Sequence, residues 1–143
     1  MNVRAPSSLP GRAEETLSSD ALVTLLRAGG EATRLRILAL LATAGELNVK
    51  DLTQILGQSQ PRVSRHLKVL CDAGLLERIR EGASVFYGVP PSGPGAMAAR
   101  TILDLADAPD EPLSGDRERL AAVVATRREA AARKMGSFRN FYG

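Results

Sequence analysis

The sequence contains no tryptophan, 3% aromatic residues and a single cysteine. So few aromatic side chains argue against a base-stacking platform for single-stranded nucleic acid. One cysteine, Cys71, cannot form an intrachain disulfide, which argues against an extracellular disulfide scaffold. No apolar run approaches the roughly 18 residues of a membrane-spanning helix, and the N-terminus has no signal-peptide pattern. We therefore expect a cytoplasmic protein with no membrane partner.

The sequence also lacks a catalytic constellation. General acid–base or nucleophilic catalysis by His66, the only histidine, needs a partner that no motif supplies. The glycines of "PSGPGAM" are followed by no Lys-Ser/Thr pair, so they do not form a phosphate loop. A transition-metal site needs three or four imidazole or thiolate ligands, more than one cysteine and one histidine provide. We expect no enzyme, no cofactor and no metal site.

What the chain does have is an ordinary globular composition with one concentration of charge. Its 143 residues, 44% hydrophobic and 24% charged, suit a single domain with tails. Between Gln60 and Arg80, five cations stand against two acids, so this stretch carries the whole formal net charge of +3. Such clustering is typical of a surface that docks a phosphate backbone. A solvated helix face explains the charge alone equally well.

Helical periodicity and glycine stops divide the chain into segments. Residues 1–17, rich in Pro, Ser and Gly, are predicted to be a flexible tail. Helices are expected in "SSDALVTLLRAGG", "EATRLRILALLATAG", "NVKDLTQILG" and "QPRVSRHLKVLCDAG". The second is apolar around much of its circumference and should be the central buried helix. Two more are expected, in "AMAARTILDLADA" and from about 115 to 135, after Pro- and Gly-rich breaks.

Between the fourth helix and the breaker "PPSGPG" the pattern changes to a period of two. "LLERIR" and "SVFYGV", separated by Glu81-Gly82-Ala83, predict a β-hairpin over about 75–89. Three helices followed by a hairpin is the order of a winged helix-turn-helix. The predicted fold class is therefore mainly α with a small β-hairpin. We assign residues 18–108 to this domain and 109–143 to a C-terminal helix and tail.

The fourth helix, about 60–73, presents two different faces. Val63, Leu67 and Leu70 form an inward stripe, whereas the outer positions carry donors and mixed donor–acceptors without a carboxylate. A helix that enters the major groove of DNA needs this division, and its N-terminal dipole favours a phosphate. The hairpin would reach a neighbouring groove or the backbone as a wing. The predicted DNA-binding residues are Gln58, Ser59, Gln60, Arg62, Ser64, Arg65, His66, Lys68, Arg78, Arg80 and Ser84.

Some alternatives stay open. His66 lies between the stripe and the basic face, where it would either touch phosphate or close the edge of the core. Cys71 follows Leu67 by four residues, which favours a small buried hydrophobe over a redox-responsive thiol. A winged helix can also serve as a protein-interaction module, since fold alone does not determine function. An acidic or apolar outer face would favour that module, and the outer face is neither.

Residues 31–89 resemble the ArsR-type (ArsR/SmtB) family of bacterial winged-helix repressors. The segments "SQPRVSRHLKVLCDAGLL" and "REGASVFYGV" are the most specific part of the match. The resemblance implies a homodimer, built by the first and C-terminal helices, that binds an imperfect palindromic operator in double-stranded DNA. It also implies release by a small-molecule effector, whose identity the sequence does not indicate. The helix from about 115 to 135 resembles the family's dimerisation and extension helix.

The sequence departs from the metal-sensing members of that family. Those members carry thiols on the third helix in a segment like "ELCVCDL", where this chain reads "ELNVKDL" with Asn48 and Lys50. Zinc-sensing members use histidines on the C-terminal helix, and this chain has none there. We therefore expect a variant that binds no metal.

Overall fold

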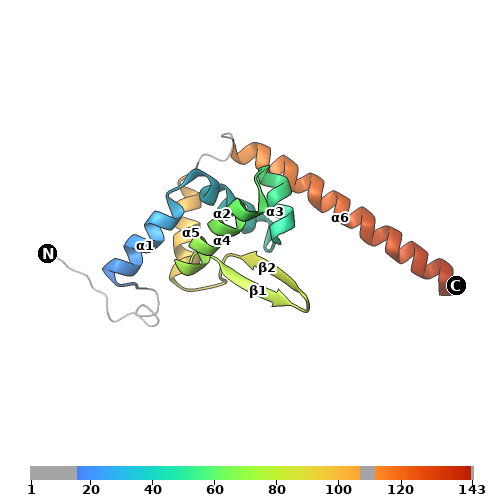
Figure 1. Cartoon of the computed structure of the whole chain (residues 1–143), viewed down its shortest axis with the longest axis horizontal. Coiled ribbons are helices and arrows are strands. Elements are labelled where there is room, and N and C mark those ends of the chain that lie inside the picture. Colours follow the sequence, from blue (N-terminus) through green and yellow to red (C-terminus); the bar gives the residue numbers. More distant parts are fainter. Residues whose placement is uncertain (1–15, 107–111, 143) are drawn as a thin grey trace.

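The computed structural model of the chain describes residues 16–106 and 112–142, with side chains up to 136. The predicted tail at 1–17 lies outside the described residues up to position 15, as does the predicted boundary at 108. The elements run in the order shown in Figure 1: α1 (Ser19–Gly29), α2 (Ala32–Ala44), α3 (Val49–Leu56), α4 (Gln60–Asp72), β1 (Glu77–Glu81), β2 (Ser84–Gly88), α5 (Pro94–Asp104) and α6 (Leu113–Tyr142). The predicted fold class, mainly α with a small β-hairpin, is confirmed.

The first three helices each begin at a side chain that accepts hydrogen bonds from their first turn. Ser18 accepts from the amide of Ala21, and Asn48 accepts from that of Asp51 at 2.8 Å. At the start of α2, the Glu31 carboxylate accepts hydrogen bonds from the amides of Thr33 and Arg34. These contacts satisfy amides that have no partner within a helix and so set where each helix begins.

The core forms around α2 and the inner face of α4. Ile37 and Leu38 of α2 are fully buried, which confirms α2 as the central helix. Val63, Leu67 and Leu70 are also fully buried, so the predicted inward stripe of α4 is confirmed. The helix α4 packs against α1, α2 and α3. This anchoring leaves the opposite side of α4 free to face solvent.

The hairpin spans Glu77 to Gly88, within the predicted range of about 75–89. Its turn consists of Gly82 and Ala83 alone, because Glu81 pairs with Ser84, so the predicted three-residue connection is one residue too long. The strand begins at Glu77 because the amides of Leu75 and Leu76 donate to the Leu70 carbonyl and close α4 instead. Both leucines are buried in the core.

The second strand is tied to the helical body as well as to its partner strand. Tyr87 exchanges backbone hydrogen bonds with Leu47, at N···O distances of 2.9 and 3.1 Å. The next residue, Gly88, lies so close to the preceding loop that a Cβ there would be 2.7 Å from the carbonyl oxygen of Gly45. Any side chain at this position would push the hairpin away, so the glycine allows the hairpin to dock.

The long helix α6 is docked on α2 and α3 through its first half. Leu120 and Val123 are buried there, and Asp116 is only 1% exposed. Its carboxylate accepts hydrogen bonds from Arg36, at 2.8 and 2.9 Å, and from Arg119 at 2.7 Å. Burial alone would raise the pKa of Asp116, but the hydrogen bonds and charges of the two arginines outweigh it and lower the pKa.

We predict that Asp116→Asn loosens α6 and lowers the free energy of unfolding by about 3 kcal/mol, since it leaves arginine charges without their buried partner. The pKa of Asp116 lies below its ordinary 3.8. The stabilisation is therefore complete above about pH 4 and is lost as the pH falls through the folded-state pKa. Urea unfolding at pH 7 and at pH 3 measures both effects. Asp72→Asn, which removes an exposed ion pair with Lys68, is the control. Equal effects of the two variants would contradict the docking role of Asp116.

Candidate nucleic-acid interface

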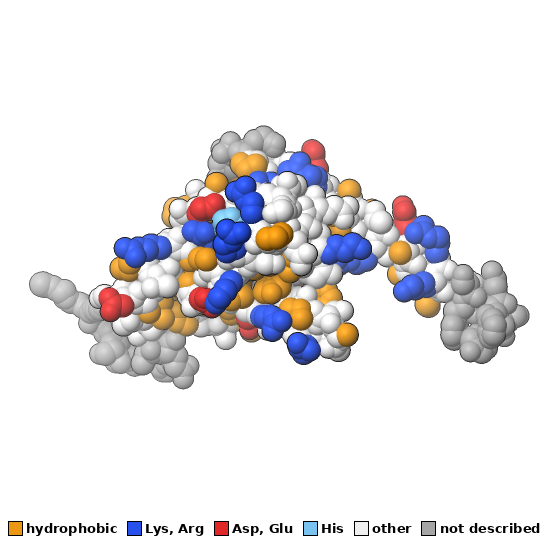
Figure 2. All heavy atoms as spheres, in the orientation of Figure 1, with side chains coloured by type: hydrophobic (Ala, Val, Ile, Leu, Met, Phe, Trp, Pro, Cys, Tyr) orange, Lys and Arg blue, Asp and Glu red, His pale blue; other side chains and the backbone are white. Residues whose placement is uncertain are grey.

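The outer face of α4 forms an exposed basic surface. Its predicted contact residues Gln60, Arg62, Ser64, Arg65 and Lys68 are all exposed. Figure 2 shows lysine and arginine side chains gathered over α4, and further cations over the hairpin on the same face of the molecule. The structure therefore brings these residues together on one side, with the hydrophobic stripe of α4 on the other.

The cations of α4 differ in whether a carboxylate of the same chain already neutralises them. Lys68 lies 2.8 Å from the carboxylate of Asp72, and this hydrogen bond, together with the charge of Asp72, raises the pKa of Lys68. Arg62 and Arg65 have no hydrogen-bond or ion-pair partner within residues 16–106 and 112–136. Their guanidinium groups are thus the most available for an anionic partner, and their planar donors suit guanine edges and phosphates.

Two cations and a serine of the hairpin complete the basic face. Arg78 and Arg80 lie opposite Tyr87 and Val85 and so share one face of the two-stranded sheet. Both arginines are exposed, and Ser84 is exposed beside the turn. The predicted wing residues are therefore exposed, so that a partner bound to the outer face of α4 can also contact them.

Gln58 occupies a different environment from the other predicted contact residues. Its side-chain amide donates to the Thr33 hydroxyl at 3.0 Å, which links the turn before α4 to α2. The Gln58 carbonyl oxygen Oε1 is buried and has no hydrogen-bond partner in the described part of the chain. Gln58 therefore fixes the entrance to α4, whereas Ser59 next to it is exposed and makes no side-chain cap.

His66 is largely covered, with 17% of its side chain exposed. Nη1 of Arg34 lies 3.1 Å from its Nδ1, and because a guanidinium can only donate, Nδ1 must accept. Burial lowers the pKa of His66, and the charges of Arg34, Arg62 and Arg65 lower it further against the opposing effect of Glu31. The imidazole is therefore neutral at physiological pH and offers no positive charge to a phosphate.

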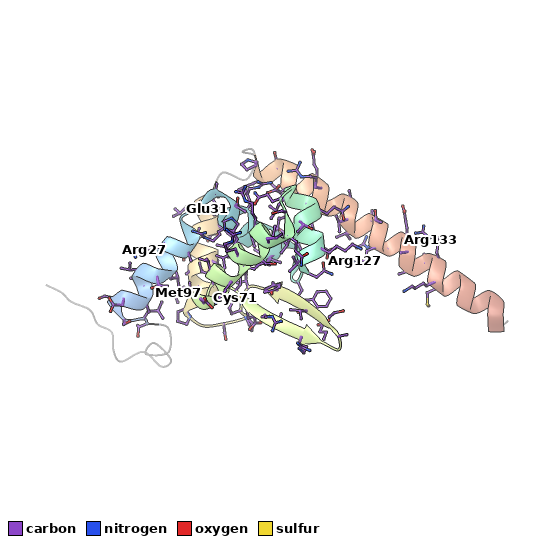
Figure 3. All side chains as sticks on the ribbon, in the orientation of Figure 1. Arg27, Glu31, Cys71, Met97, Arg127 and Arg133 are labelled. Carbon is purple, nitrogen blue, oxygen red and sulfur yellow. The ribbon has the colours of Figure 1, made fainter. Side chains whose placement is uncertain are left out.

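Arg34 makes this contact part of a wider junction. Its Nε donates to the Ala28 carbonyl at 2.6 Å and its Nη2 to that of Arg27 at 3.4 Å, both near the end of α1. Arg34 thereby connects α1, α2 and α4, and its backbone amide donates to Glu31, which Figure 3 labels where α1 meets α2. Sequence reasoning did not single out Arg34 or Glu31, because only the packing of three helices brings them to His66.

Cys71 is partly buried on the inner side of α4, close to the start of the hairpin. Burial raises the pKa of its thiol, and the charge of Asp72 raises it further, against Arg78 and Lys68. A thiol with a raised pKa holds little of the reactive thiolate at neutral pH. The environment of Cys71 therefore favours the packing role over the redox alternative.

The positions where metal-sensing relatives carry thiols serve other purposes in this chain. Asn48 caps α3, as described above, and Lys50 is exposed on its first turn. Residues 16–106 and 112–136 contain no group of three or more His, Cys, Asp or Glu side chains that could hold a metal ion. Within the same part of the chain, no helix combines the length and apolar character that crossing a bilayer requires.

Comparison with known proteins points to one class of regulator. The model of the family "Bacterial regulatory protein, arsR family" matches residues 31–78. The arsenical resistance operon repressor of Escherichia coli (strain K12) is 39% identical over 102 residues, which cover 71% of this chain and 80% of that protein. The arsenic resistance transcriptional regulator ArsR1 of Pseudomonas putida is 44% identical over 91 residues, 64% of this chain and 70% of that protein.

A solved structure agrees with these matches. It is the homodimeric winged helix-turn-helix DNA-binding domain of a possible ArsR-family transcriptional regulator from Mycobacterium bovis, at a TM-score of 0.55 and 25% identity. The alignment covers 71% of this chain and 90% of that domain. The order α3, α4 and hairpin is therefore a winged helix-turn-helix, as the sequence predicted.

We predict that His66 makes stability depend on pH between about pH 5 and 7. Because its folded-state pKa lies below the ordinary 6.5, the unfolded state binds more protons in that window and stability rises with pH. The stabilisation is fully present above pH 6.5 and is lost as the pH falls through the folded-state pKa. His66→Asn keeps an acceptor for Arg34 without the titration, so its stability should be nearly constant over this range. Urea unfolding at pH 5, 6 and 7 tests this, and equal slopes for both proteins would contradict it.

Proposed function

This chain belongs to the arsR family of bacterial regulatory proteins, and on that basis we propose that it is a sequence-specific repressor of transcription that binds double-stranded DNA. The observation that carries the proposal is that two arginines of α4, Arg62 and Arg65, are exposed and have no ion-pair partner in the described part of the chain. These side chains project from a helix whose opposite face is locked into the core. The proposal makes the protein a regulator rather than an enzyme, acting in the cytoplasm where bacterial DNA lies.

In this proposal α4 lies in the major groove and the hairpin contacts the backbone beside it. Gln60, Arg62, Ser64 and Arg65 read base edges or bind the flanking phosphates, since these positions hold the exposed donors. Lys68 must exchange Asp72 for a phosphate and therefore contributes less than Arg62 and Arg65. Arg78, Arg80, Ser59 and Ser84 contact phosphates as the edge and wing of the same surface.

Gln58 and His66 take supporting roles in this proposal. Each is partly or largely covered and bonded to α2, Gln58 through Thr33 and His66 through Arg34. Their contacts hold the angle of α4 against the body, so they position the reading residues instead of meeting DNA directly. This revises the sequence-based expectation for these two residues on the basis of their hydrogen bonds.

A homodimer would form through the apolar face that α1 and α5 share. Leu22, Val23, Leu26 and Met97 are between 44% and 56% exposed, an unusual cluster for large apolar side chains. A groove between the two helices is lined by Leu22, Leu26, Met97 and Ile102 among others. The apolar stripe of α6 is already buried within its own chain, which favours α5 over α6 as the partner of α1. Two copies related by a twofold axis would read an imperfect palindrome with half-sites about 34 Å apart.

Release of the operator would follow the binding of a small molecule to this dimer. The curated relatives named above carry arsenic in their names, but Asn48 and Lys50 stand where thiols would be needed. An arsenic or zinc ion would find too few soft ligands around Cys71 or α3. The proposed effector is therefore a small molecule that binds without a metal ion.

We predict that Arg62→Ala and Arg65→Ala each weaken binding to the operator about 10- to 100-fold, the usual effect of removing a bidentate pair with a base. The duplex would be obtained by in-vitro selection from random DNA with the wild-type protein. Where an arginine binds a phosphate instead, the slope of log affinity against log salt should flatten by about 0.9 for each phosphate that is no longer neutralised. Gel-shift titrations at several salt concentrations measure both effects.

Two variants calibrate that experiment. Arg80→Ala removes a cation of the wing and should weaken binding by less than either α4 variant. Arg100→Ala removes an exposed arginine of α5 that belongs neither to the proposed DNA contacts nor to the apolar dimer face, and it should leave the affinity unchanged. Wild-type affinity in both Arg62→Ala and Arg65→Ala would refute the assignment of α4 as the reading helix.

For the dimer, we predict that Leu26→Glu converts the protein to a folded monomer, because it places a charge in the shared apolar face. Light scattering on a sizing column measures the mass, and circular dichroism checks the fold. Met135→Glu is the matched control, since Met135 is 63% exposed on α6. Loss of the dimer in Met135→Glu with retention in Leu26→Glu would show that α6 forms the dimer, as the family resemblance implied.

A further inference from the structure

Within the side chains that the structure describes, the distal end of α6 extends past the helices on which its first half is docked. Its inner stripe is buried at Leu120 and Val123, and Arg127 forms an ion pair with Asp51 of α3. Beyond that point, residues 131–136 are all exposed. A 30-residue helix is about 45 Å long, and Figure 1 shows it projecting well clear of α3 and the hairpin. The packing of this chain alone does not explain so long a helix.

The projecting segment is strongly basic. We call residues 128–136 the distal arm; it carries Arg128, Arg133 and Lys134 against the single acid Glu129. All three cations are exposed, and none has an ion-pair partner within residues 16–106 and 112–136. The arm is also rich in alanine and other good helix formers, so it can stay helical without a packing partner. It therefore presents fixed positive charge at a distance from the core.

The direction of the arm is set by contacts near each end of the docked half of α6. At one end the buried carboxylate of Asp116 is held by Arg36, and at the other Arg127 is paired with Asp51. In Figure 2 the cations of α6 lie on the same visible face as those of α4 and the hairpin. Figure 3 shows Arg127 directed toward the body, with Arg133 farther out along the helix. The arm thus extends the basic face of α4 sideways.

The arm also points away from the proposed dimer interface. Figure 1 shows α1 and α5 on one side of the molecule and the C-terminal end of α6 on the opposite side. If two copies meet through α1 and α5, their arms run outward, in the direction in which straight DNA continues beyond each half-site. Lysine and arginine on such an arm would meet phosphates, which carry charge but no sequence information.

We propose that the distal arm binds the phosphate backbone of double-stranded DNA outside the half-site that α4 and the hairpin read. This proposal rests on the proposed function and adds a second, sequence-independent contact to it. The arm lengthens the footprint of each protomer and strengthens binding in long DNA without changing which operator is chosen. The partner is duplex DNA rather than a protein surface because the exposed part of the arm is basic and almost free of large apolar side chains.

The test uses the full-length protein and two duplexes. Both contain the operator obtained by in-vitro selection, one with minimal ends and one with about 10 extra base pairs of arbitrary sequence on each side. The triple variant Arg128→Ala/Arg133→Ala/Lys134→Ala removes the cations while alanine maintains the helix. We expect wild type to bind the long duplex about tenfold more tightly, and the variant to bind both duplexes equally. The variant's salt slope on the long duplex should flatten by about 0.9 for each phosphate that the arm no longer neutralises.

Internal controls separate the possible failures. Glu129→Gln removes the only acid of the arm and should tighten binding to the long duplex while leaving the short one unchanged. Failure of the selection to yield a duplex that the wild type binds more tightly than random DNA would refute the proposed function itself. If the wild type binds both duplexes with the same affinity, or if the triple variant shows the same length dependence as the wild type, only the proposed role of the arm is overturned. A change in the mass of the triple variant by light scattering would also overturn it, because the arm would then contact protein.

Discussion

The burial of Val63, Leu67 and Leu70 is the constraint on which the rest of the molecule depends. These side chains are fully buried along one face of α4, which packs among α1, α2 and α3. Because that face is buried, the helical spacing directs Arg62 and Arg65 toward solvent. A change of register along α4 would bury the arginines, at a prohibitive desolvation cost, and expose the leucines. The hydrophobic core thus determines which residues can meet DNA.

Polar contacts refine what the core determines. Apolar packing chooses the face of a helix but is non-directional, whereas hydrogen bonds fix its angle. Arg34 ties His66 of α4 to the carbonyls at the end of α1, and Gln58 ties the turn before α4 to Thr33. Arg34 therefore joins α4 to α1, the helix that also carries the proposed dimer face.

The basic face and the apolar face occupy different parts of the molecule. Exposed leucines on α1 and Met97 on α5 lie at one side (Figure 3), and the exposed cations of α4, the hairpin and α6 spread from the centre to the other (Figure 2). A regulator that assembles through one surface and binds through another can do both at once. The buried carboxylate of Asp116 accepts hydrogen bonds from Arg36 and Arg119 and so holds α6 on the helical body.

The sequence by itself determined the element types, the two faces of α4 and the family. Each of these depends on neighbouring residues: a period of 3.6 residues for α4, a period of two for the hairpin, and the family match over residues 31–78. Only the tertiary structure decided that His66 is a neutral acceptor for Arg34 and that Asp116 anchors α6. Those pairs join residues 32 and 80 positions apart, and no local pattern records such a distance. The hairpin began later than its pattern predicted because Leu75 and Leu76 were needed to close α4 over the core.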